Sequence, residues 1–124
     1  MSNISSFEDL DCWKACREVR KNVTRLVKKL PKEEQYQLTA QMKNASRSVT
    51  HNIAEGYGRF HFLDNAKFCR NARGSIYEVI DQLITALDEK FITREEYKLS
   101  RSIIEKAVKL LNGYIRYLVE SSKT

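Results

Sequence analysis

Apolar side chains recur at three- and four-residue steps along most of this chain of 124 residues. That spacing is the repeat of one face of an α-helix, whereas a half-buried strand alternates apolar and polar residues every second position. Only one proline and four glycines are present, so few positions can interrupt a helix. The pattern therefore predicts a fold made of long helices.

Four stretches carry the repeat, and two of them begin with a Ser or Thr followed three residues later by Glu, at Ser5 and at Thr93. This spacing is typical of a capping box, in which the two side chains satisfy free backbone N–H groups. The helices are expected from Ser5 or Ser6 to Pro31, over 33–55, over 62–88 and over 93–120. Helices of about 25 residues, each ~37 Å long, joined by short connections predict an all-α, antiparallel up-down four-helix bundle, with residues 1–124 as one domain.

The strongest break in the pattern is the segment from Asn52 to Arg59, NIAEGYGR. Glycine takes positive φ without a steric penalty, so Gly56 and Gly58 directly after a helical run predict a helix end and a change of direction. Asn52 and Glu55 fall at the edge of the apolar arc. We expect them to organise this junction by accepting hydrogen bonds from free backbone N–H groups, or by pairing with Arg73.

The third helix contains two residues that do not fit its pattern. Arg73 falls inside the apolar arc, where an unpaired guanidinium would be costly, so it needs an acidic or carbonyl partner. Gly74 lies in the middle of the helix, where glycine costs about 1 kcal/mol relative to alanine. A close approach by another helix at Gly74 would account for it.

The last helix has an apolar face that covers about half of its circumference, wider than the roughly 100° stripe that an outer helix of a small bundle needs. The surplus predicts a subunit interface, with one apolar ridge as its candidate residues: Ile104, Val108, Leu111, Ile115 and Val119. The alternative is that this helix is simply the best buried of the four.

The net charge of +6 makes polyanions plausible partners, and the charge is uneven along the chain. Residues 41–75 hold six basic and two acidic residues, whereas 76–124 are balanced. The segment predicts a basic face that binds nucleic acid, with these candidate contacts: Lys43, Arg47, His51, Arg59, Lys67 and Arg70. Tyr57 and Phe60 could stack on unpaired bases. The alternative is that the charges are ordinary solvated ones and that both aromatic rings pack under the turn.

A second basic run, between Val19 and Lys32, contains no acidic residue. Because cations suit the C-terminal end of a helix, this run is interpreted as a solvated face of the first helix.

Catalytic and metal-binding patterns are weak. A di-iron bundle needs Glu-x-x-His pairs, and the sequence has none; His51 with Glu55, or His61 with Asp64, would supply only two ligands each. The spacing of the three cysteines fits neither a disulfide framework nor a zinc site, which predicts buried, reduced thiols. We therefore expect a protein without catalytic activity, metal or cofactor.

The lack of a long apolar run or signal sequence predicts a cytoplasmic protein outside the membrane.

Three segments in fixed order resemble a known family: Phe7 to Trp13 (FEDLDCW), Asn52 to Arg59 (NIAEGYGR) and Phe68 to Glu78 (FCRNARGSIYE). The chain resembles the four-helix-bundle family of proteins encoded by intervening sequences in bacterial large-subunit ribosomal RNA genes. It is also similar to the accessory variability proteins of diversity-generating retroelements. One departure is His61, where many members begin the third helix with Ser or Thr, a stronger cap.

The resemblance implies a four-helix bundle that assembles into a ring-like homopentamer with a basic surface. In the retroelement branch, such rings bind nucleic acid and a reverse transcriptase. The function expected for this chain is thus that of a non-enzymatic accessory protein that binds RNA in preference to DNA, with a reverse transcriptase as a candidate partner. The alternative is a structural oligomer that binds another protein without nucleic acid.

Overall fold

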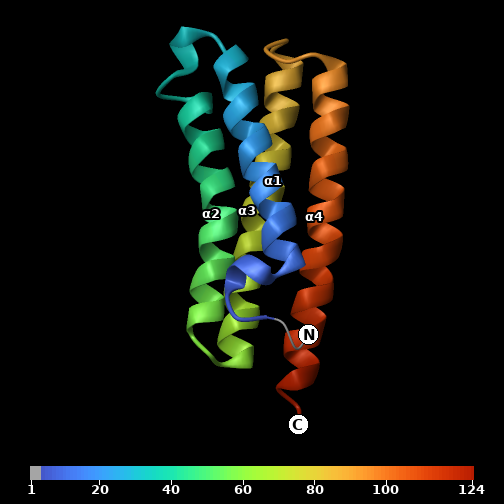
Figure 1. The fold of residues 1–124 in the computed structure, drawn as a ribbon. Helices are drawn as coiled ribbons and strands as arrows, with labels where there is room; N and C mark the ends of the chain where they lie inside the picture. Colours follow the sequence, from blue (N-terminus) through green and yellow to red (C-terminus); the bar gives the residue numbers. More distant parts are fainter. Residues whose placement is uncertain (1–3) are drawn as a thin grey trace.

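The computed structural model describes residues 4–124, and over that range the chain forms four α-helices and no strand. The helices are α1 (Asp11–Leu26), α2 (Leu38–Gly58), α3 (Phe62–Asp88) and α4 (Arg94–Ser121). They run side by side along one axis, and each packs against its neighbours in the chain, with α1 also against α4 (Figure 1). The predicted all-α fold of four helices is confirmed, and the bounds of α3 are those expected from the sequence.

Hydrogen bonds across the helix seams give the relative directions of the helices. The hydroxyls of Ser48 on α2 and Ser75 on α3 lie 2.9 Å apart. Further along, the Gln82 Nε2 of α3 donates to the backbone oxygen of Gln41, at 3.3 Å. Because residue numbers fall on α2 as they rise on α3, the two helices are antiparallel. A buried bond of 2.8 Å from Asn22 Nδ2 to the Ser100 hydroxyl fastens α1 to α4.

The apolar faces of all four helices meet in one core. Its largest fully buried side chains include Met42, Ile53, Ile76, Leu83 and Leu111. Two of the residues expected at a subunit interface, Ile104 and Leu111, are 2% and 0% exposed, and Ile115 is buried as well. These three fill the chain's own core, so the interface prediction is wrong for them. Val108 and Val119 pack against the core and remain half-buried.

The start of the first helix differs from its prediction. The capping box there joins Ser6 to Asp9, not Ser5 to Glu8, and it caps a short 3-10 turn at Phe7–Asp9. Hydrogen bonds donated from Ser5 to the Asp9 carboxylate lower the pKa of that group. The turn has extended backbone at Leu10 after it, and so α1 begins only at Asp11. The capping box of Thr93 and Glu96 at the start of α4 is confirmed.

Helix α2 ends within the segment that the sequence predicts, but at Gly58, three residues beyond the expected end at residue 55. It runs through Gly56 to Gly58, and no glycine has positive φ. The left-handed residue is instead Phe60, with φ of 58°. The first predicted turns of this helix are also absent, since residues 32–34 form a separate 3-10 turn and α2 starts at Leu38.

Gly56 allows α3 to pack close to α2 because it has no side chain. A Cβ at this position would lie 2.8 Å from Asn65 Oδ1 and 2.9 Å from the Cβ of Phe68, both on α3. By contrast, a Cβ at Gly74 would meet no atom within 4 Å, so the close approach expected there is wrong. The tight contact between helices is therefore at the α2–α3 corner.

The polar residues near the corner have partners other than those expected. Asn52 Nδ2 donates to the backbone oxygen of Ser48 at 2.9 Å, and Glu55 pairs with Arg59 at 3.0 Å. Arg73 donates to the amide oxygen of Asn112 on α4, at 2.8 Å. The expected carbonyl partner of Arg73 is confirmed, whereas its pairing with Asn52 or Glu55 is wrong. Asn52 lies one turn from both Ser48 and Gly56, on the side of α2 that faces α3, and it also donates to the Ser48 hydroxyl at 3.0 Å. Its amide therefore joins the α2–α3 seam through Ser48, whereas Glu55 bonds to Arg59 on the outside of the helix.

Substitution by alanine should have opposite effects on stability at Gly56 and at Gly74. Gly56→Ala should lower the free energy of unfolding by about 1–3 kcal/mol, because the new methyl group overlaps atoms of α3. Gly74→Ala should raise it by about 0.5–1 kcal/mol, because the site is open and alanine favours the helix. Urea denaturation of both variants checks the pair. Equal stability of the Gly56→Ala protein and the wild type would contradict the close approach.

Removing one partner of the Arg73–Asn112 hydrogen bond should destabilise the protein more than removing the other. Asn112→Ala should destabilise the protein by about 1 kcal/mol, because it leaves a half-buried guanidinium without its acceptor. Arg73→Met should cost less, because it removes the charge together with the need for a partner. Thermal denaturation midpoints measure both effects, and the reverse order would show that the hydrogen bond is not what holds Arg73.

Candidate nucleic-acid interface

Helix α2 carries the first part of the predicted basic face. Lys43, Arg47 and His51 follow one another at four-residue steps on one continuous helix, with Arg47 and His51 exposed and Lys43 half-buried. Arg59 is the residue that caps α2. At 1.5 Å per residue, the strip from Lys43 to Arg59 is about 24 Å long.

Helix α3 contributes two exposed cations that do not face the same way. Phe68 and Ser75 face α2, through the Gly56 approach and the Ser48 hydroxyl. At about 100° per residue, Lys67 flanks this seam, whereas Arg70 is turned about 160° away from it. The structure therefore brings Lys67 near the α2 strip and places Arg70 on the side of α3 away from α2.

Helix α1 borders the other side of the α2 strip. Arg20 Nη1 donates to the Thr50 hydroxyl of α2 at 3.0 Å, which places Arg20 in the seam between the two helices. Arg17, one turn earlier, is exposed with its guanidinium 5.7 Å from the centroid of the Trp13 ring. We call Arg17, Arg20, Lys43 and Arg47 the α1–α2 basic face. The sequence analysis interprets the basic run of α1 as a solvated face and does not join it to α2. The signal for a basic face was the lack of any acidic residue from Val19 to Lys32.

Arg59 is less free than the other exposed cations. Its Nε lies 3.0 Å from a carboxylate oxygen of Glu55, and its guanidinium lies 4.9 Å from the centroid of the Phe68 ring. Half of its side chain still faces solvent. The Arg59 charge is thus partly offset by Glu55 and held at the corner of the bundle.

The two aromatic residues proposed to stack on bases differ in exposure. Tyr57 is half-buried and packs against the core, so the alternative that it lies under the turn holds for this residue. Phe60 is 83% exposed, and its ring centroid is 6.3 Å from that of Tyr57. Only Phe60 of the pair presents most of its ring to solvent.

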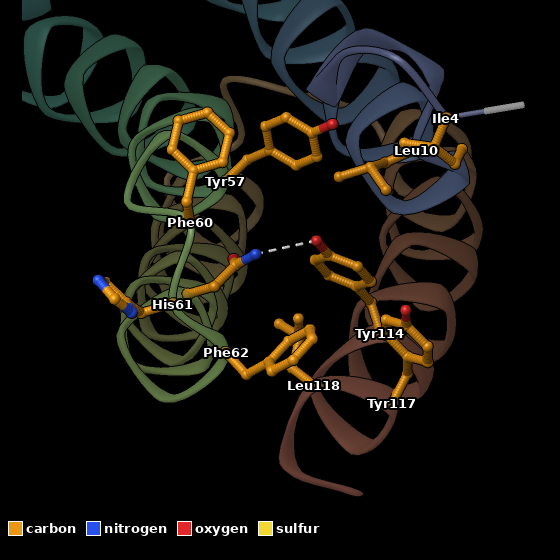
Figure 2. A pocket seen from close by; sticks show the side chains of 10 residues that line it. Ile4, Leu10, Tyr57, Phe60, His61, Phe62, Tyr114, Tyr117 and Leu118 are labelled. Carbon is orange, nitrogen blue, oxygen red and sulfur yellow. Dashed lines mark hydrogen bonds between the residues drawn. The ribbon is translucent and has the colours of Figure 1, made fainter. Parts of the chain in front are cut away.

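A cavity of about 270 Å³ opens at this end of the bundle, between the α2–α3 corner, the C-terminal half of α4 and the segment before α1 (Figure 2). Tyr57, Tyr114 and Tyr117 are among the residues that line it. Asn65 is buried at its wall and donates from Nδ2 to the Tyr114 hydroxyl at 3.0 Å. Burial raises the pKa of Tyr114 to about 12, so this hydroxyl keeps its proton at neutral pH. Sequence reasoning missed the cavity, because its walls come from distant parts of the chain.

Within residues 4–124, no cluster of three or more His, Cys, Asp or Glu side chains could hold a metal ion. The three cysteines are free and buried, as predicted. Burial raises the pKa of the Cys16 and Cys69 thiols to about 12, and that of Cys12 further still. These thiols are therefore protonated at neutral pH, which makes them poor nucleophiles.

None of the described helices is both long and apolar enough to cross a membrane.

Comparison with known proteins bears on the same segments. No curated protein matches the chain. A family model described as 23S rRNA-intervening sequence protein matches residues 8–113, which include α1, α2, α3 and most of α4. This match covers well over half of the sequence and agrees with the resemblance of the three segments that begin at Phe7, Asn52 and Phe68. The chain belongs to the 23S rRNA-intervening sequence protein family.

Proposed function

We propose that this protein is a non-enzymatic accessory protein that binds RNA in the cytoplasm through the α1–α2 basic face. The observation that carries the proposal is the seam between Arg20 and Thr50, which joins the basic run of α1 to the basic strip of α2. Lys and Arg side chains along such a strip neutralise phosphates without reading bases. The net charge of +6 supports the attraction over longer distances.

Self-association is part of the proposal, in the form of a ring-like homopentamer. It is supported by a groove between α3 and α4 that is lined by Tyr77, Ile80 and Val108 among others. Tyr77 is exposed in the single chain, and Val108 belongs to the apolar ridge of α4. A second copy that covered this groove would bury apolar surface and repeat the basic face around the ring.

A reverse transcriptase is the proposed protein partner. This step is supported by the likeness of the sequence segments to accessory variability proteins, in which the bundle binds both nucleic acid and such an enzyme. The preference for RNA over DNA is supported by the family's link to ribosomal RNA.

The competing function is a structural oligomer that binds another protein and no nucleic acid. The exposed apolar side chains Leu63, Tyr77, Ile84 and Leu99 favour it, because they could contact a protein partner. The two functions differ in their dependence on charge: a scaffold tolerates charge reversal on the α1–α2 basic face, whereas an RNA-binding protein does not.

Charge reversal on the basic face gives the test. Arg47→Glu, alone or with Arg70→Glu, should weaken binding to single-stranded and structured RNA by about tenfold or more, because a phosphate contact becomes a repulsion. Fluorescence anisotropy measures the affinity. Lys98→Glu, an equal change of charge on an exposed part of α4, should have a much smaller effect.

Comparison of the single variants separates the two sides of α3. If Arg70→Glu alone leaves RNA affinity unchanged while Arg47→Glu lowers it, the contacts lie on the α1–α2 side. Light scattering checks that the oligomeric state is the same in all variants. Equal affinities of wild type, Arg47→Glu and the double variant would contradict RNA binding through this face and favour the scaffold.

A further inference from the structure

We propose that the cavity at the α2–α3 corner binds one unpaired nucleobase of the RNA, stacked on its aromatic rings. This inference rests on the proposed function and gives it a second component, because the α1–α2 basic face contacts phosphates only. The ligand class is a planar heterocycle attached to a sugar-phosphate strand.

Aromatic rings from two parts of the chain gather at this opening. Tyr57, Phe60 and Phe62 come from the corner between α2 and α3, and Tyr114 and Tyr117 come from α4. Figure 2 shows Tyr57, Phe62 and Tyr114 around the open space, Phe60 beside Tyr57, and His61 directed away. Tyr114 and Tyr117 are nearly parallel, at 17° with centroids 6.2 Å apart, and Tyr117 is about half exposed. Any base can stack on such rings, since every base has a π-face.

The hydrogen-bonded pair of Asn65 and Tyr114 at the wall of the cavity favours a heterocycle over a hydrocarbon as the ligand. The Tyr114 hydroxyl accepts a hydrogen bond from Asn65, which is only 7% exposed. Within residues 4–124, no acceptor is found for the proton of that hydroxyl. A tyrosine hydroxyl can donate as well as accept, so it is free to donate to a carbonyl oxygen or ring nitrogen of a base.

The size and the charge of the site fit one base on a strand. A volume of about 270 Å³ is near the lower end of the range for pockets that hold small molecules, about 300–1,000 Å³. It therefore suits a single ring system. Arg59 directly precedes Phe60, and its half-exposed side chain, although paired with Glu55, places a cation at the corner for the phosphate next to the bound base.

The backbone at Phe60 is the independent sign of a function. Phe60 has φ of 58°, a left-handed conformation that is unfavourable for a bulky residue, although the residue is 83% exposed and contributes little to the core. The other non-glycine residue with positive φ among the described residues is Lys90, in the loop after α3 at the opposite end of the bundle. Glycine would adopt this backbone without strain, and a contact between the exposed ring and a base would account for phenylalanine at position 60.

The experiment uses two strands of abasic nucleotides, one with a single 2-aminopurine and one with no base. The wild-type protein should bind the strand with the base about tenfold more tightly, and the fluorescence of 2-aminopurine should fall as the base stacks. Phe60→Gly should lose most of this preference and keep the affinity for the strand without a base. Its urea midpoint should equal or exceed that of the wild type, because glycine relieves the left-handed backbone.

Two further variants complete the test. Lys90→Gly relieves the same backbone conformation far from the cavity, and it should leave the preference for the base unchanged. Tyr117→Leu keeps an apolar side chain at the opening but removes the ring, so it should reduce both the preference and the fall in fluorescence. Equal preference for the base in Phe60→Gly, Tyr117→Leu and the wild type would overturn the base site while RNA binding by the basic face stood.

Other outcomes also decide the question. If the wild type binds neither strand nor ordinary RNA, the proposed function and the base site both fail. If light scattering shows that Phe60→Gly turns an oligomer into a monomer, the ring is a subunit contact and the base site is overturned.

Discussion

The close approach of α2 and α3 at Gly56 is the constraint on which the corner of this bundle depends. A methyl group there would overlap Asn65 and Phe68, so only glycine allows α3 to begin as near to α2 as it does. The short connection that results leaves little freedom for the residues between the helices. Phe60 takes the left-handed conformation within it, and α3 starts two residues later.

The same approach positions Asn65, which links the corner to the last helix. From its buried place beside Gly56, Asn65 donates to the Tyr114 hydroxyl of α4. That bond lies at the wall of the cavity, and the aromatic rings of α4 close the other side. The corner is therefore a joint of three helices, with a cavity at one end of the molecule and a basic face along α1 and α2.

Much of the fold follows from the sequence. The three- and four-residue spacing of apolar side chains is enough to predict four helices, and the capping box at Thr93 marks the start of α4 correctly. The predictions that were wrong concern which property of a residue the fold depends on. Glycine ends helices by taking positive φ and also admits close neighbours by having no side chain, and a sequence does not say which property Gly56 and Gly74 supply. Likewise, the wide apolar face of α4 is used mostly within the chain's own core.

The candidate site was harder to predict, because it depends on which helices are neighbours. Arg47 and Arg70 belong to the same basic segment of the sequence, yet they lie on different sides of the bundle. Arg20, in contrast, is thirty positions from Thr50 and donates a hydrogen bond to it. The cavity combines Leu10, Tyr57, Asn65 and Tyr114, which no spacing rule connects. The partners of Arg73 and Asn65 are amide and hydroxyl groups on α4, which periodicity cannot pair.

The salt dependence of RNA binding tests the central claim, which is that affinity comes from phosphate contacts along a basic face. For single-stranded RNA, the logarithm of the association constant should fall linearly with the logarithm of the salt concentration, with a slope of about −0.7 for each phosphate contact. With several contacts, the affinity of the wild-type protein should fall by at least about tenfold between ~50 and ~200 mM salt. An affinity that is unchanged over this range, or an absence of RNA binding at the lowest salt, would contradict the account.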